Sequence, residues 1–186
     1  AAGSLDGSCL VIGCGPVGLA VIAALKQKGC GPIVASDFSP RRRELAEILG
    51  ADEVINPADS SPYDSWRAIS ASAKKTIDKS SPHDGLRPKK GGIIFECVGV
   101  PGVIEEIMTG AMRGTSVVVV GGCMQQDSFR PMVAIGKELN LQFVLGYSAK
   151  EFRDTLRAIA EGELNVENLI TGKVGIDGIA QAFNDL

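Results

Sequence analysis

Short apolar runs alternate along the chain with stretches whose apolar residues recur every three or four positions. The runs have the length and the β-branched content of buried strands. Strands are predicted at residues 9–12, 32–37, 52–55, 93–97, 115–120 and 139–145. Because helical stretches separate most of these runs and the connections are short, we predict an α/β fold. It would be a doubly wound, parallel, six-stranded sheet with helices on both faces.

The helical stretches carry their own start signals. Ser39 followed by Pro40 is typical of a helix N-terminus, and Ser148 with Glu151 forms a capping box. Helices are predicted at residues 17–28, 40–49, 63–77, 103–112, 149–161 and 176–183. The apolar stripes expected to face the core are Leu45, Ile48 and Leu49 in the second helix, and Phe152, Leu156, Ile159 and Ala160 in the fifth.

Two stretches lack a clear periodicity. Residues 125–136 are mixed, and Pro131 prevents one continuous element there. Residues 78–90, from Asp78 to Lys90, are rich in Ser, Pro, Gly and Lys, which predicts a solvated loop. The single histidine, His83, lies in that loop, where we expect it to be exposed rather than catalytic or metal-binding.

The clearest candidate site follows the first predicted strand. Gly13, Gly15 and Gly18 have the G-x-G-x-x-G spacing of a dinucleotide-binding turn, and they stand between a strand and a helix. In such a turn the first glycine allows the tight bend, and the second lets a pyrophosphate approach the backbone. The third lets the helix pack closely on the strand. Pro16 suits the first helical turn, whose free N–H groups and dipole favour an anion.

An acidic residue completes this signal. Asp37 lies 19 residues after Gly18, at the end of the second predicted strand, where its carboxylate can accept hydrogen bonds from both hydroxyls of an adenine ribose. The same charge would repel a 2′-phosphate, which favours NAD over NADP. Arg41, Arg42 and Arg43 act in the opposite direction, because arginines nearby can hold a phosphate. We therefore predict a NAD site, with NADP as the less favoured cofactor.

Composition narrows the function further. The chain has 186 residues, 45% of them hydrophobic, which suits one soluble domain with a full core. Its net charge of −3 predicts no nucleic acid partner, no apolar run has the length of a membrane span, and residues 1–8 do not resemble a signal peptide. The five scattered cysteines lack a C-x-x-C pair, so we expect reduced thiols, a cytoplasmic location and no metal site in this chain.

Six longer stretches resemble the coenzyme-binding domain of the medium-chain dehydrogenase/reductase superfamily, in its zinc-dependent alcohol and polyol dehydrogenase branch. They are VIGCGPVGL, SDFSPRRRELAEILGADEVINP, IIFECVGVPG, MRGTSVVVVGG, KELNLQFVLGYSAKEF and LITGKVGIDGIAQAF. The resemblance covers residues 5–186 and departs from the family at 78–90, which looks like an inserted loop. It implies a Rossmann fold in which residues 1–186 form one dinucleotide-binding domain.

The resemblance also implies roles for matched residues. Those of the glycine loop would hold the cofactor's pyrophosphate: Gly13, Gly15, Pro16, Val17 and Gly18. Asp37 would hold the adenosine ribose, with Arg42 beside it. The nicotinamide half would lie against two strand ends, one formed by Cys97, Val98 and Gly99 and the other by Val120, Gly121 and Gly122. These positions lie at the carboxyl ends of predicted strands, where open α/β sheets bind ligands.

The resemblance implies that full-length members of this branch carry their zinc ligands and proton-relay residues in an N-terminal catalytic domain, which we expect to be missing from this chain. The resemblance therefore implies the NAD-binding half of an alcohol or polyol dehydrogenase, with no catalytic or metal-ligating residue of its own. It would be inactive alone and would orient the nicotinamide for hydride transfer with a small alcohol. Two alternatives stay open: the coenzyme domain of a zinc-free NADPH enone or quinone reductase of the same superfamily, and a non-catalytic nucleotide-binding module.

The last predicted strand, from Leu139 to Leu145, should form an edge of the sheet. Its core, LQFVL, is apolar, and an uncovered apolar edge tends to pair with another chain. The family often dimerises through this end of the domain, so a homodimer is one expectation. Burial of the strand under the terminal helices is the other.

Overall fold

The computed structural model describes residues 7–74, 91–170 and 172–185. Within these residues, six strands form one parallel sheet in the order β3-β2-β1-β4-β5-β6. The strands are β1 (Cys9–Ile12), β2 (Ile33–Ser36), β3 (Glu53–Ile55), β4 (Ile93–Glu96), β5 (Ser116–Val119) and β6 (Asn140–Phe143). The strand order reverses between β1 and β4, as in a doubly wound Rossmann fold, so the predicted fold class is confirmed.

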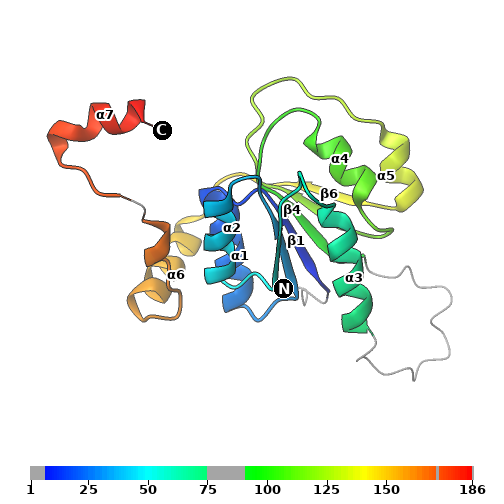
Figure 1. The fold of residues 1–186 in the computed structure, drawn as a ribbon, viewed down its shortest axis with the longest axis horizontal. Helices are drawn as coiled ribbons and strands as arrows, with labels where there is room; N and C mark the ends of the chain where they lie inside the picture. Colours follow the sequence, from blue (N-terminus) through cyan, green and yellow to red (C-terminus); the bar gives the residue numbers. More distant parts are fainter. Residues whose placement is uncertain (1–6, 75–90, 171, 186) are drawn as a thin grey trace.

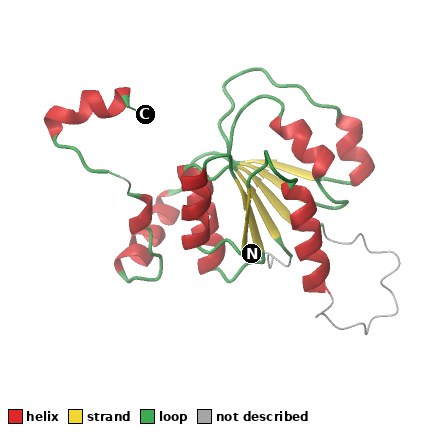
Figure 2. Cartoon of the chain, viewed as in Figure 1, coloured by secondary structure: helices red, strands yellow, loops and turns green. Residues whose placement is uncertain are grey.

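Helices lie on both faces of this sheet (Figures 1 and 2). The α-helices are α1 (Pro16–Gln27), α2 (Pro40–Ile48), α3 (Pro62–Lys74), α4 (Val103–Gly110), α5 (Pro131–Lys137), α6 (Ala149–Ala160) and α7 (Ile179–Asn184). Helices α1 and α2 cover one face with α6 beside them, whereas α3, α4 and α5 cover the other; α7 lies away from both layers (Figure 1).

Each central strand contributes to two separate cores. On β1, Cys9 and Val11 pack in the cluster beneath α1 and α2, while Leu10 packs in the cluster beneath α3 and α4. The second cluster also contains Trp66 and Ile107, both fully buried. Because both faces of the sheet are covered, its central strands are apolar at nearly every position. This burial holds the carboxyl ends of β1, β2, β4 and β5 at one edge of the sheet.

The predicted helix starts agree with the structure. The Ser39 hydroxyl accepts a hydrogen bond from the Arg42 amide, and Pro40 occupies the first turn of α2. At α6 the capping box is complete: the Glu151 carboxylate accepts from the Ser148 amide at 2.7 Å, and the Ser148 hydroxyl accepts from the Glu151 amide at 3.2 Å. In the mixed stretch, Pro131 begins α5, where its missing N–H costs nothing.

The predicted apolar stripe of the fifth helix is wrong as a buried surface. Phe152 is 54% exposed, Leu156 57% and Ile159 41%, and within the described residues of α6 only Ala158 is buried. The periodicity identifies the apolar residues of the helix, but these side chains stay about half exposed in the described part of the chain. The helix itself lies beside the α1 and α2 layer (Figure 1). Likewise Ile48 of α2 is 53% exposed.

Some predictions lie outside the described residues. These are the solvated loop at residues 78–90 with His83, the end of the third predicted helix at residues 75–77, and the first six residues. In the part of the chain that the structure describes, no helix has both the length and the apolar character needed to cross a membrane.

Candidate cofactor-binding site

Two glycines of the G-x-G-x-x-G loop are required by close packing. Gly13 has a φ of +91°, and a Cβ at this position would lie 2.8 Å from a methyl group of Val98. A Cβ on Gly18 would collide with the carbonyl oxygen of Gly13. These contacts show why the strand can turn sharply after β1 and why α1 can lie so close to it.

The middle glycine differs, because it faces open space. No atom lies within 4 Å of the place where a Cβ on Gly15 would stand. Gly15 is the N-cap of α1, no side chain caps that helix, and Val17 in its first turn is 49% exposed. Helix α1 therefore begins beside a space that a bulky side chain would have filled, and the N–H groups of its first turn have no acceptor within the helix. This arrangement fits a phosphate group.

The carboxylate of Asp37 joins the glycine loop to the start of α2. Its Oδ2 accepts a hydrogen bond from the Cys14 amide at 2.8 Å, and its Oδ1 accepts one from the Ser39 amide at 2.8 Å. Asp37 is only 9% exposed. Each carboxylate oxygen can accept a further hydrogen bond, so a ribose remains chemically compatible with this position. The structure thus adds a loop-holding role to the residue predicted to bind the sugar.

The three arginines after Asp37 have different partners. Arg41 pairs with Glu44 at 2.6 Å, and Arg43 donates to the carbonyl oxygens of Asp37 and Phe38, both at 2.8 Å. Arg42 is more loosely held, since its guanidinium lies 3.7 Å from the Asp37 carboxylate and its side chain is 55% exposed. Arg42 is therefore the arginine best placed to contact a ligand above the carboxylate.

The two strand ends predicted for the nicotinamide half meet in the structure. Gly99 has a φ of +72°, and a Cβ there would lie 2.7 Å from the amide nitrogen of Gly122. A Cβ on Gly121 would collide with the Gly99 amide nitrogen. The amides of Val120 and Gly121 both donate to the backbone oxygen of Glu96 at 2.9 Å. The turn after β4 and the turn after β5 therefore form one tightly packed unit.

Sequence reasoning missed Glu96 at the centre of this unit. The residue is 2% exposed, and its Oε1 accepts hydrogen bonds from the amides of Val98 at 2.7 Å and Gly99 at 2.8 Å. Its Oε2 would lie 2.5 Å from a Cβ on Gly121. A glutamate that ends the otherwise apolar strand IIFE was the available signal, because a charged side chain in a buried strand needs polar partners.

The cysteines near the loop have the character of buried thiols. Burial, together with the charge of Asp37, raises the pKa of Cys14 to about 12. Burial and the charge of Glu96 likewise raise the pKa of Cys97 to about 12. Both thiols are protonated at neutral pH and are poor nucleophiles. In residues 7–74, 91–170 and 172–185, no three His, Cys, Asp or Glu side chains gather as metal ligands would.

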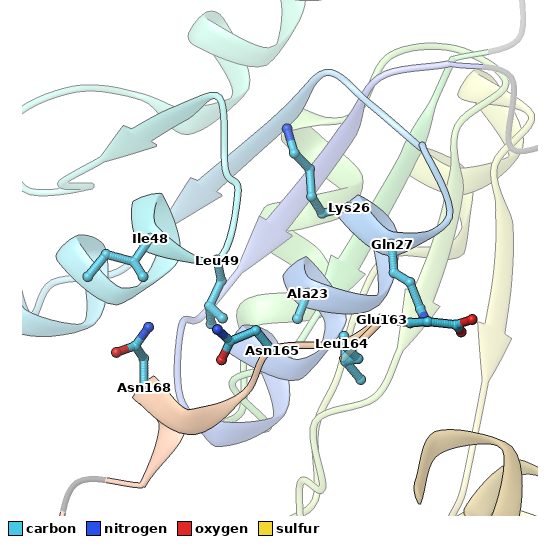
Figure 3. A pocket seen from close by; sticks show the side chains of 9 residues that line it. All are labelled: Ala23, Lys26, Gln27, Ile48, Leu49, Glu163, Leu164, Asn165 and Asn168. Carbon is cyan, nitrogen blue, oxygen red and sulfur yellow. The ribbon is translucent and has the colours of Figure 1, made fainter. Parts of the chain in front are cut away.

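A separate hollow of about 250 Å³ lies near the C-terminal ends of α1 and α2 (Figure 3). Its lining includes Lys26, Leu49 and Leu164, and it contains none of the predicted cofactor-binding residues. The predicted cofactor residues lie instead in or next to the turns that follow β1, β2, β4 and β5, so this hollow is not the candidate site.

Comparison with known proteins gives the family. Residues 16–161 match the family model described as zinc-binding dehydrogenase, and the chain belongs to this family. It is 32% identical over 184 residues to (R,R)-butanediol dehydrogenase of Saccharomyces cerevisiae, covering 96% of this chain and 44% of that protein. It is 30% identical over 185 residues to L-idonate 5-dehydrogenase (NAD(P)(+)) of Escherichia coli, covering 98% of this chain and 48% of the relative.

Solved structures agree with this assignment. L-idonate 5-dehydrogenase from Escherichia coli superposes with a TM-score of 0.69 at 28% identity, over 88% of this chain and 42% of that one. The 2R,3R-butanediol dehydrogenase from Bacillus subtilis gives a TM-score of 0.65 at 26% identity, over 84% of this chain and 40% of that one. The chain thus spans less than half of the length of the relatives it matches.

Proposed function

We propose that this chain is the NAD-binding part of a zinc-dependent alcohol or polyol dehydrogenase. The observation that carries the proposal is the open space above Gly15 at the uncapped start of α1, with the Asp37 carboxylate hydrogen-bonded to the same loop. The family match and the dehydrogenase relatives support it.

In this proposal each part of the site has a separate task. Gly13, Gly15, Pro16, Val17 and Gly18 bind the pyrophosphate at the start of α1, where N–H groups and the helix dipole favour an anion. Asp37 binds the adenosine ribose and Arg42 flanks it. The turns Cys97, Val98, Gly99 and Val120, Gly121, Gly122 orient the nicotinamide ring. The bound cofactor supplies the hydride chemistry, and the chain supplies its position.

Zinc and substrate have their place elsewhere in the parent protein. We propose that the zinc ligands belong to another part of the parent protein, as the resemblance to the family implies; among the described residues no three His, Cys, Asp or Glu side chains gather as metal ligands would. The relatives named above act on butanediol and idonate, so we propose a small alcohol or polyol as the substrate. A steady-state assay on the full-length parent tests this, and its failure to oxidise any such alcohol with NAD would contradict the proposal.

Titration calorimetry tests cofactor binding by the chain itself. We expect heat with NAD and weaker binding of NADP, because a 2′-phosphate would approach the carboxylate of Asp37. The isolated chain should turn over no alcohol. A folded sample that gives no heat with either cofactor would contradict the proposed function.

We also propose a homodimer through β6. This strand is an edge of the sheet, and Phe143 is 63% exposed, Val144 40% and Leu145 fully. An apolar edge with unpaired backbone groups favours pairing with a second copy. Light scattering should give a dimer for the natural chain and a shift to monomer for Phe143→Glu. A monomer at high concentration of the natural chain would refute this proposal.

A further inference from the structure

The buried carboxylate of Glu96 stands directly beneath the two turns that the proposed function assigns to the nicotinamide ring. Its Oε1 holds the amides of Val98 and Gly99, and its Oε2 lies against Gly121. The backbone amides of Val120 and Gly121 donate hydrogen bonds to the backbone carbonyl oxygen of Glu96. Glu96 therefore touches residues of both turns while being 2% exposed to solvent.

This carboxylate is not neutralised by a neighbouring cation. Among the ion pairs of the described residues, none involves Glu96, whereas Asp37 in the other half of the site has Arg42 at 3.7 Å. Amide hydrogen bonds stabilise a negative oxygen without cancelling its charge at a distance. The charge also acts on its surroundings, since it contributes to the raised pKa of Cys97.

We infer that Glu96 is a positioning residue whose negative charge favours the oxidised cofactor, NAD⁺, over NADH. The inference rests on the proposed function, which places the nicotinamide ring on these turns. The ring carries a positive charge in NAD⁺ and none in NADH, while the two phosphates are the same in both. Repulsion between Glu96 and the phosphates therefore cancels when the two affinities are compared. The attraction between Glu96 and the oxidised ring does not cancel, and water screens a buried charge only weakly.

The test is the ratio of the dissociation constants of NAD⁺ and NADH, measured on the 186-residue chain by calorimetry and by NADH fluorescence. Glu96→Gln keeps the size and an acceptor oxygen but removes the charge. We expect it to raise the Kd for NAD⁺ about fivefold and to change the Kd for NADH by less than about twofold. Glu96→Ser, which leaves room for a water molecule at the two amides, is a second neutral variant and should shift the ratio in the same direction.

Glu53→Gln is the matched control, because it removes the same charge from the start of β3, away from the carboxyl ends of the strands where the site lies. It should leave both constants unchanged. If the neutral variants lower both affinities equally, Glu96 has only a structural role and the inference is overturned. If the natural chain binds neither form, the proposed function fails and the inference fails with it. If the natural chain binds both forms and the neutral variants show the same ratio of dissociation constants, only the inference is contradicted and the proposed function stands.

Discussion

The two halves of the candidate site hold their loops by the same device but differ in charge. In one half, Asp37 follows β2 and accepts the amides of Cys14 and Ser39; in the other, Glu96 ends β4 and accepts those of Val98 and Gly99. Asp37 has an arginine nearby and Glu96 has none among the described residues. The first carboxylate thus suits hydrogen bonding to a sugar, whereas the second acts as a fixed negative charge.

The largest expected effects come from the glycines that are closely packed in each half. Gly18→Ala should lower the free energy of unfolding by about 3 kcal/mol, because the new methyl group meets the Gly13 carbonyl. Gly121→Ala should cost about as much, since its methyl group meets the Gly99 amide and the Glu96 carboxylate. Urea unfolding measures both. A loss below about 0.5 kcal/mol in either would show that its half is not rigidly packed.

Gly15 and Gly122 allow the two halves of the site to be tested separately, because each half is expected to bind a different part of the cofactor. No atom lies within 4 Å of the place where a Cβ on Gly15 or on Gly122 would stand, so alanine at either position should leave the fold stable. Gly15→Ala should weaken NAD and ADP-ribose alike, by about tenfold, because both ligands carry the pyrophosphate. Gly122→Ala should weaken NAD and spare ADP-ribose, which lacks the nicotinamide. The measurement is calorimetry with NAD and with ADP-ribose. Equal losses of affinity for the two ligands in Gly122→Ala would place that residue outside the nicotinamide half.

A change at Asp37 tests the adenosine half by cofactor choice. Asp37→Asn keeps the shape but removes the charge, so we expect NAD to bind about tenfold more weakly and NADP no worse than before. One amide partner is also lost, which should lower the free energy of unfolding by about 1 kcal/mol. Titration with both cofactors is the measurement. Unchanged NAD affinity would remove Asp37 from the site and leave it only its loop-holding role.

The last expected effect is a dependence of stability on alkaline pH, which is small near neutral pH and grows only above pH 9. The pKa of Cys14 and of Cys97 is raised from 9.0 to about 12 in the folded chain. Above pH 9 the unfolded state loses these protons first, so the stability that the protonated thiols contribute is lost as pH rises from 9 towards 12. Urea unfolding at rising pH should therefore show a smaller decline in Cys14→Ala than in the natural chain. Identical slopes would contradict the raised value at Cys14.

The geometry of the glycine loop could be predicted from the sequence because local rules fix it. A sharp turn after a strand requires glycine at Gly13, and close helix packing requires it at Gly18, so a spacing visible in the sequence already specifies the geometry. The six strands were readable for a similar reason, since burial on both faces makes them apolar throughout.

The geometry of the nicotinamide half was harder to predict from the sequence, because it depends on contacts between residues that are distant in the chain. Glu96 matters through Gly121, on a turn that follows another strand, and no local pattern joins the two. The apolar face of α6 is a second feature that the sequence alone could not place, in this case at the surface. Periodicity shows which side of a helix is apolar, but only the tertiary structure shows whether another element covers it.

A crystal structure of the chain with NAD tests the central claim most directly. We predict that the pyrophosphate lies over Gly15, with its oxygens accepting hydrogen bonds from the first N–H groups of α1, and that the Asp37 carboxylate accepts the ribose hydroxyls. A cofactor bound elsewhere, with protein side chains filling the space above Gly15, would contradict the account.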